Sequence, residues 1–328
     1  MTPLLQDPTV LTVILNWRTA DMTLGAVAAA EIAMQGIAGG IVVVDNDSGD
    51  GSFEKLQAAL ADRPGIRVVQ SGHNGGFGAG NNVAIRLGLA DGSRPDFVYI
   101  LNSDAFPAPD AIWQLITYLQ AHPDAGFAGS LIHGPEGDDH MTCFRFPSIA
   151  SEFEGAARTG PISRWLASRS VRHGVPAASG PVDWLAGASL MMRDHVLQEI
   201  GLFDEAFFLY FEETDLCRRA RAAGWTTHFV RESRVEHIGS VSTGMKQWSR
   251  VPGYWFDSRW LYFRKQGGTL QAVLATGAHV AGGLVIRLRR LVQPKISADP
   301  PHFLRDIVGH ALRQIARQTF RRAPDNGS

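Results

Sequence analysis

Short apolar runs alternate with longer alanine- or leucine-rich segments along the first 122 residues. The apolar runs are rich in β-branched side chains and predict buried strands at residues 11–17, 41–44, 66–69 and 97–101. The segments between them predict helices at residues 21–34, 53–60 and 83–89, and a fourth helix follows the last strand and ends at about residue 122. Strands and helices in alternation predict an α/β fold, with a mostly parallel central sheet and helices on both faces.

The rest of the chain is less regular. Residues 134–181 carry little periodic pattern, and we assign them no role. Beyond them the pattern predicts a small-residue turn that enters a strand within residues 183–193, and a further strand at 226–230. It predicts helices at 194–200 and 216–224. Three helical segments follow in the last third, an aromatic-rich one, a weakly polar one and a basic one, at residues 248–266, 269–286 and 300–322.

Polar residues follow the carboxyl ends of two predicted strands. Parallel sheets bind their ligands at these ends. Asp45 ends the second strand, and Asn102, Ser103 and Asp104 end the strand at 97–101. An acid in the position of Asp104 can hold a divalent cation with substrate phosphates, although a turn or helix cap is an equally good interpretation of that residue alone.

The glycine-rich segment at residues 74–82 has the spacing of neither a Rossmann fingerprint nor a P-loop. It still offers backbone that can approach a ligand closely and a helix N-terminus that favours negative charge. A tight structural turn is the alternative.

A second unusual stretch joins the apolar residues 207–211 directly to the acids Glu212, Glu213 and Asp215. Like charges beside an apolar wall repel each other and lose solvation, so a purely structural sequence would disperse them. The acids precede a short predicted helix with three arginines. A helix cap with ion pairs to those arginines explains this stretch alone as well as a catalytic site does.

Composition narrows the function classes. The chain of 328 residues has 31 basic and 32 acidic residues, a net charge of -1, so its total charge gives no reason to expect a nucleic-acid partner. The two cysteines, Cys143 and Cys217, lie far apart and suit a reducing compartment rather than a zinc cluster or a disulfide scaffold. The N-terminus has no signal-peptide pattern, so we expect a cytoplasmic protein.

Taken in order over residues 12–240, these motifs resemble the family 2 inverting glycosyltransferases with the GT-A nucleotide-diphospho-sugar transferase fold, particularly the rhamnosyltransferase-like branch. The resemblance implies that Glu213 is the general base, with Glu212 in support and Asp215 capping the helix or orienting its arginines. It implies nucleotide-sugar contacts from Asn16, Asp45, Asn74, Gly76, Asn81, Asn102 and Ser103. It also places Trp184, Gly187 and Ala188 near the donor sugar and acceptor.

The resemblance further implies a divalent cation, manganese or magnesium, held by Asp104 and His237. Two positions depart from the family pattern: Asn102 stands where many members have Asp, and Glu213 stands where Asp is more usual. The implied reaction moves a sugar, with inversion, from a donor of the dTDP-rhamnose or UDP-hexose type to a polysaccharide or lipid-linked saccharide. The departures leave open a catalytically silent nucleotide-sugar-binding protein, and the shared sheet leaves open a nucleotidyltransferase.

For the domains, we expect a catalytic part at residues 1–240, with a nucleotide-binding half at 1–125 and an acceptor-side half at 126–240. Residues 241–328 are expected to form a helical extension. Within it, the weakly polar segment and the basic last helix favour an in-plane membrane helix on the inner membrane face, with a soluble helical pair nearly as well supported. A homo-oligomer is also compatible with the sequence.

Overall fold

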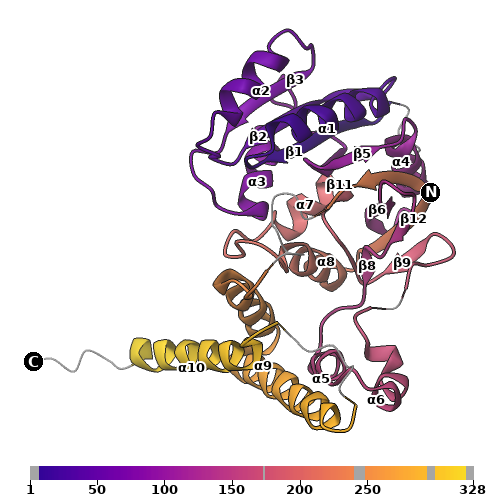
Figure 1. Cartoon of the computed structure of the whole chain (residues 1–328). Coiled ribbons are helices and arrows are strands. Elements are labelled where there is room, and N and C mark those ends of the chain that lie inside the picture. The colour runs from indigo at the N-terminus through magenta and orange to yellow at the C-terminus, as the bar shows by residue number, and fades with distance from the viewer. Residues whose placement is uncertain (1–6, 173, 240–247, 294–299, 323–328) are drawn as a thin grey trace, which may run out of the picture. The chain divides into compact units, whose positions relative to one another are not determined.

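The computed structural model describes residues 7–172, 174–239, 248–293 and 300–322 (Figure 1). The chain divides into two compact units, the first made of residues 1–144 and 174–245 and the second of residues 145–173 and 246–328. The second unit therefore includes part of the excursion to which the sequence assigned no role. The predicted boundary between residues 240 and 241 lies outside the described residues and stays a prediction.

The first unit holds a ten-stranded mixed sheet. Its four N-terminal strands, in the spatial order β3-β2-β1-β4, are all parallel, and they are β1 (Thr9–Asn16), β2 (Ala38–Asp45), β3 (Ile66–Gln70) and β4 (Phe97–Asn102). The order continues through β11 (Ser189–Arg193), β6 (Ala125–His133), β12 (Thr226–His237) and β5 (Ala105–Pro107). β11 is antiparallel to both its neighbours, whereas β12 runs parallel to β6. Short strands complete the unit: β7 (Asp139–His140), β8 (Cys143–Phe144), β9 (Gly180–Val182) and β10 (Trp184–Leu185).

Helices cover both faces of this sheet (Figure 1). α1 (Ala20–Ala33) and α4 (Ala111–Ala121) pack on one face, where the core consists of small and branched side chains such as Val10, Ile14 and Ile112. α3 (Phe77–Leu87), α7 (Asp194–Ile200) and α8 (Glu212–Ala222) pack on the other face, and α2 (Ser52–Leu60) lies beside β3. The predicted α/β architecture is confirmed.

Three elements differ from the sequence prediction. α3 begins at Phe77 rather than Val83, so most of the glycine-rich segment forms the first turns of a helix. β6 was not predicted, because it is built largely of small residues, yet it is buried between β11 and β12. β12 continues to His237 instead of ending at Val230, with an irregularity in register between Val230 and Arg234.

The second unit is helical. It comprises α5 (Ile149–Ala157), α6 (Gly160–Trp165), the 3-10 turn η1 (Ala167–Arg169), α9 (Gly253–Arg290) and α10 (Phe303–Arg322). α9 contains a kink where Gly267 and Gly268 leave helical geometry, which matches the break between the two predicted segments. Inside the unit, Arg259 is 2% exposed and its Nη2 donates to Glu152 Oε2 at 2.9 Å. Burial alone would raise the pKa of Glu152, but Arg259 and His279 lower it to about 2.

Candidate active site

The ends of β1 and β2 are joined by a buried polar network. Asn16 Nδ2 donates to Asp45 Oδ2 at 2.7 Å, and Ser48 donates its hydroxyl to the same oxygen at 2.6 Å. The Ser48 N–H donates to Asp45 Oδ1 at 3.0 Å. Asp45 is fully buried, so both of its oxygens already hold the loop after β2. A contact from Asp45 to a nucleobase stays a prediction.

The glycine-rich segment packs against the stretch that leads into the acid cluster. The Phe77 N–H donates to the Phe208 carbonyl at 2.9 Å, and a Cβ on Gly76 would lie 1.8 Å from the same carbonyl oxygen. Gly76 also has φ +89°, so glycine is required there on two counts. Asn74 Oδ1 accepts the Asn46 side chain at 3.0 Å, which secures the turn before α3.

Asn82 joins α3 to the loop before α8, a role that the sequence did not indicate. This fully buried amide donates to the Phe203 carbonyl at 2.9 Å and accepts the Phe203 N–H at 3.2 Å. It also donates to Glu205 at 2.9 Å. The neighbouring Asn81, which the sequence favoured, is buried too and donates within its own helix, to the Phe77 carbonyl. Asn82 therefore fastens the glycine-rich helix to the loop that precedes the acids.

We expect Asn82→Ala to lower the free energy of unfolding by about 2 to 4 kcal/mol, because it leaves a buried N–H and a buried carbonyl without their partner. Urea denaturation measures the effect. The matched control is Glu205→Gln, which keeps an acceptor at a half-exposed position and should cost less than about 1 kcal/mol. An Asn82→Ala protein as stable as the control would show that the hydrogen bonds of Asn82 contribute little to the free energy of unfolding.

The carboxyl end of β4 meets the end of β12. Antiparallel pairing of β5 with β12 sets Ala105 opposite His237, which brings His237 Nε2 to 3.0 Å from Asp104 Oδ1. Asn102 Nδ2 lies 3.4 Å from the same imidazole nitrogen, and the Gly239 N–H donates to Asp104 Oδ2 at 3.1 Å. Burial opposes ionisation of Asp104, but the hydrogen bond and charge of His237 lower its pKa.

The donor set fits a divalent cation. Two ligands at right angles around an octahedral cation lie about 3 Å apart, as the Asp104 and His237 atoms do. The carboxylate suits manganese or magnesium, and the imidazole inclines the set toward manganese. Among the residues that the structure describes, no group of three or more His, Cys, Asp and Glu side chains could hold a metal ion. Substrate phosphates or water would therefore have to supply further ligands.

Glu212 and Glu213 open α8 from a backbone in unusual geometry. Tyr210 and Phe211 both have positive φ, 69° and 71°, a conformation that non-glycine residues seldom adopt and that clusters at functional sites. Phe211 is the N-cap, so all three acids fall in the first turn, as predicted from the sequence. There the helix dipole favours negative charge.

Two consecutive small residues, Gly187 and Ala188, connect Glu213 to the Asp104–His237 pair. The Gly187 N–H donates to Glu213 Oε1 at 3.0 Å, and the Ala188 carbonyl accepts the Asn102 N–H at 3.1 Å. A Cβ on Gly187 would lie 2.8 Å from Glu213 Oε1 and 2.8 Å from the Phe77 ring, so the contact needs glycine. The structure thus brings Glu213, Gly187, Ala188 and Asn102 together as a continuous set of contacts.

The two glutamates differ in their surroundings. Glu212 is 1% exposed, and its Oε2 has no hydrogen-bond partner among the described residues, whereas Glu213 keeps partial exposure. Burial and the nearby Glu213 charge raise the pKa of Glu212 well above its usual range, and burial raises that of Glu213. The neutral form is therefore favoured more strongly at Glu212 than at Glu213, because Glu212 is the more deeply buried and its pKa is raised further.

We expect the stability of the protein to fall as the pH rises above about 4.3, the unperturbed value for glutamate, because a carboxyl whose pKa is raised on folding stabilises the protonated folded state. That contribution is lost as the pH rises through the folded-state pKa of Glu212. Glu212→Gln should flatten this part of the curve and be the more stable protein at pH 8. Glu54→Gln, at an exposed site, should keep the wild-type slope, and equal slopes in all three would contradict a protonated Glu212.

The remaining predicted residues are also accounted for. Asp215 accepts Arg219 Nε at 2.9 Å, and Arg219 in turn donates to the carbonyl of Ile200 at 2.6 Å. Trp184 stacks on Phe144, with ring centroids 4.5 Å apart. Ser103 Oγ lies 3.2 Å from Thr19 Oγ1. Asp215 and Trp184 thus make structural contacts, and direct roles for them in transfer stay predictions.

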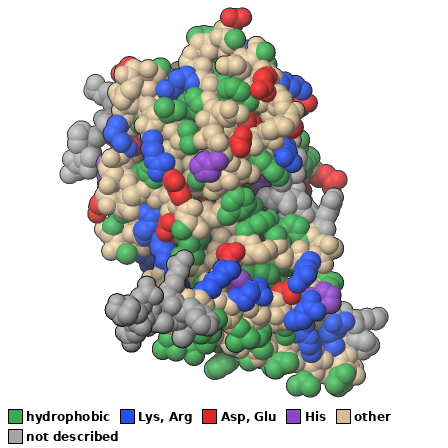
Figure 2. Space-filling view, turned by 90° about the vertical axis from the view of Figure 1, so that its left-hand side faces the viewer, with side chains coloured by type: hydrophobic (Ala, Val, Ile, Leu, Met, Phe, Trp, Pro, Cys, Tyr) green, Lys and Arg blue, Asp and Glu red, His purple; other side chains and the backbone are tan. Residues whose placement is uncertain are grey.

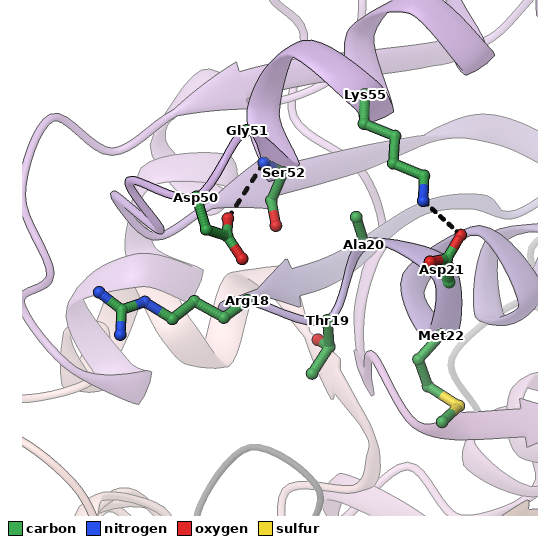
Figure 3. A pocket seen from close by; sticks show the side chains of 9 residues that line it. All are labelled: Arg18, Thr19, Ala20, Asp21, Met22, Asp50, Gly51, Ser52 and Lys55. Atoms are coloured by element: carbon green, nitrogen blue, oxygen red, sulfur yellow. Dashed lines mark hydrogen bonds and ion pairs between the residues drawn. The ribbon is translucent and has the colours of Figure 1, made fainter.

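A hollow of about 400 Å³ lies between the loops that follow β1 and β2 (Figure 3). Charged residues line it from the two loops and from the first turns of α1 and α2. The Lys55–Asp21 ion pair joins the two helices at one side, and the Asp50 carboxylate, hydrogen-bonded to the Ser52 N–H, lies at the other. Arg18, with φ 57°, joins this hollow to the buried network through its bonds to Ser48. The sequence analysis missed these residues, since they carry no motif.

The fold and this site define a GT-A type sugar transferase, and comparison with known proteins agrees. The family described as Glycosyltransferase like family 2 matches residues 8–251. The chain belongs to this family. The predicted family and GT-A fold are confirmed.

Two named relatives are rhamnosyltransferases. The chain is 32% identical over 213 residues to N-acetylglucosaminyl-diphospho-decaprenol L-rhamnosyltransferase of Mycobacterium tuberculosis strain H37Rv, covering 62% of this chain and 68% of that protein. It is 27% identical to rhamnosyltransferase WbbL of Escherichia coli K12, covering 49% of this chain and 60% of WbbL. Among solved structures, the mannosyltransferase PcManGT of Pyrobaculum calidifontis, in complex with GDP-Man and Mn2+, has the same fold, with a TM-score of 0.52 and 12% identity over 96% of this chain and 88% of that one.

Proposed function

We propose that this glycosyltransferase inverts the anomeric centre of its donor and uses Glu213 as the general base. One observation carries the proposal. Gly187 bonds the Glu213 carboxylate, and its neighbour Ala188 bonds Asn102, which lies beside the Asp104–His237 pair. Adjacent backbone contacts thus hold the proposed base and the candidate cation site in a fixed relation, which supports the positioning of reacting groups on which a single displacement depends.

In this mechanism, ionised Glu213 accepts the proton of the acceptor hydroxyl while that oxygen bonds the anomeric carbon. The bond between the anomeric carbon and the diphosphate oxygen breaks, and the nucleoside diphosphate leaves with the electron pair. A divalent cation held by Asp104 and His237 would neutralise charge on this leaving group. Burial and the neighbouring Glu213 charge favour the neutral form of Glu212, which disfavours a second negative charge beside the proposed base.

The donor and acceptor are proposed from the relatives. One relative is named for transfer of L-rhamnose to a diphospho-decaprenol-linked sugar. We infer a donor of the dTDP-rhamnose or UDP-hexose type, and an acceptor hydroxyl on a lipid-linked saccharide or a polysaccharide. The nucleoside would lie near Asp45 and the hollow between the first two loops, with Asn74, Gly76, Asn81 and Ser103 toward the diphosphate.

A lipid-linked acceptor favours a cytoplasmic enzyme that works at the inner membrane face. α9 is long and apolar enough to cross a membrane by length and composition, which is weak support for a spanning helix. A homo-oligomer stays a prediction from the sequence.

A thermal-shift screen tests the proposed function. We expect nucleoside diphosphates and one nucleotide-sugar to raise the apparent melting temperature, more so with Mn2+, because ligands that bind only the folded state stabilise it. Binding without any transfer to acceptor would favour the silent binding protein. Release of pyrophosphate would favour a nucleotidyltransferase. No shift with any nucleotide would contradict the proposal.

A further inference from the structure

The charges of the chain are divided unequally between its two units. The first unit carries 12 Lys and Arg against 26 Asp and Glu, a net charge of -14. The helical second unit carries 19 basic and 6 acidic residues, a net charge of +13. The near-neutral total thus conceals a strongly basic unit, and such a unit is attracted to an anionic surface.

The second half of α9 presents an uninterrupted apolar stripe to solvent. Its positions alternate in steps of four and three, so they lie on one side of the helix, and they are Leu270, Leu274, Gly277, Ala281, Leu284 and Leu288. The leucines are 68%, 47%, 53% and 66% exposed in that order. Leu291 continues the stripe just past the helix, and no Asp or Glu occurs between residues 269 and 293.

The opposite side of the same helix is packed within the unit. A Cβ on Gly282 would lie 2.4 Å from the Phe153 carbonyl of α5, and one on Gly283 would lie 2.7 Å from Leu304 of α10. Ala272 and Ala275 are fully buried. Because this face is already occupied, the leucine stripe is the face left without a partner among the described residues.

Basic side chains flank the stripe. Arg287 and Arg290 are exposed at the end of α9, and Arg305, Arg313 and Arg317 are exposed on α10, near the exposed Leu312. Figure 2 shows apolar side chains along the lower edge of the view, with a cluster of Lys and Arg just above them; α9 and α10 lie at this end in Figure 1. A leucine stripe bordered by arginine is the pattern of a helix that lies in the plane of a membrane.

We propose that this stripe and its flanking arginines dock the helical unit on an anionic lipid bilayer, with the second half of α9 lying in the membrane plane. This proposal rests on the proposed function, in which the acceptor is lipid-linked. It names the surface that would bring the enzyme to that acceptor. Transfer of each exposed leucine from water into the membrane interface lowers the free energy of the bound state. Each arginine adds an attraction to the negative surface potential of anionic lipid.

Two other occupants fit the structure less well. A second copy of the chain would bring one unit of charge +13 against another, which is unfavourable. A spanning helix made of the second half of α9 would lose the close packing of Gly282 and Gly283 on α5 and α10. It would also break the contact of His279 Nδ1 with Glu152 Oε2 at 2.8 Å, which would leave polar groups without partners in the lipid.

Vesicle flotation of the full-length protein tests the proposal. We expect the wild type to float with phosphatidylglycerol-rich vesicles and to bind pure phosphatidylcholine weakly. Leu284→Ser with Leu288→Ser should lower the partition into phosphatidylglycerol vesicles about tenfold or more. The matched control is Ile32→Ser with Leu87→Ser, two exposed positions of the first unit, which should bind as the wild type does. Circular dichroism establishes that all variants are folded.

The charge contribution is tested in the same assay. Arg287→Gln with Arg290→Gln should lower binding to phosphatidylglycerol vesicles about tenfold or more, and added salt should shrink the difference. The proposal is overturned if the wild type fails to float, or if the Leu284→Ser, Leu288→Ser variant binds as well as its control. It is also overturned if the wild type forms an oligomer that this variant dissociates and neither protein binds vesicles. Flotation needs no transferase activity, so this proposal and the proposed function can fail separately.

Discussion

Replacing Glu213 by Gln is expected to lower sugar transfer about a thousandfold, because a positioned general base contributes about that much. Gln has the same shape and keeps an oxygen that can accept the Gly187 N–H, so the site should remain assembled. Only the capacity to take a proton is lost. The initial rate of transfer, measured at saturating donor and acceptor, reports the effect.

Nucleotide affinity serves as the internal control for this substitution. We expect the same thermal shift with nucleoside diphosphate in the wild type and in Glu213→Gln, since the predicted nucleotide contacts come from other residues. In the wild type, the acid limb of the pH profile should lie above the usual glutamate range, because burial raises the pKa of Glu213. Turnover at the wild-type rate by Glu213→Gln would remove this residue from the mechanism.

Asp104→Asn is expected to lower transfer at least about a hundredfold at low Mn2+, because charge stabilisation by a bound cation is worth several kcal/mol. The amide keeps the shape of the side chain but loses the anionic ligand. Part of the activity should return at high Mn2+, because the remaining ligands still bind weakly. Titrating Mn2+ against the rate distinguishes the two proteins.

His237→Ala provides the matched test of the second ligand and should also raise the Mn2+ concentration needed for half-maximal rate. A purely structural Asp104–His237 pair predicts something different. Both variants would then lose stability, and their response to Mn2+ and to chelator would match that of the wild type. That outcome would contradict a cation site at these two residues.

Local patterns were enough to predict most of the first unit. The β-branched runs became β1 to β4, and the acids of residues 212–215 fell in the first turn of α8. β6 was not predicted for two reasons. A strand buried on both faces shows no alternation of apolar and polar residues, and the small residues of β6 include few β-branched side chains. The early start of α3 escaped for a related reason: glycines read as a loop when their role is close packing, as Gly78 and Gly80 show.

Long-range contacts could not be predicted from the chain alone. Asp104 and His237 are 133 residues apart and meet through the register of β5 on β12, which no local pattern encodes. The resemblance paired them, and the structure supplies the physical reason. Asn82 is similar, since its importance comes from a single loop 121 residues away. The total charge also conceals the difference between two units of opposite sign, which only the division of the chain makes visible.

The most direct test supplies the purified protein with dTDP-rhamnose or UDP-hexoses, Mn2+ and a lipid-linked saccharide acceptor, and measures nucleotide products and glycosylated lipid together. We expect the wild type to release nucleoside diphosphate and form glycosylated lipid in equal amounts, and Glu213→Gln to form almost none. Binding of donor without turnover, release of pyrophosphate, or equal product from both proteins would contradict inverting sugar transfer with Glu213 as the base.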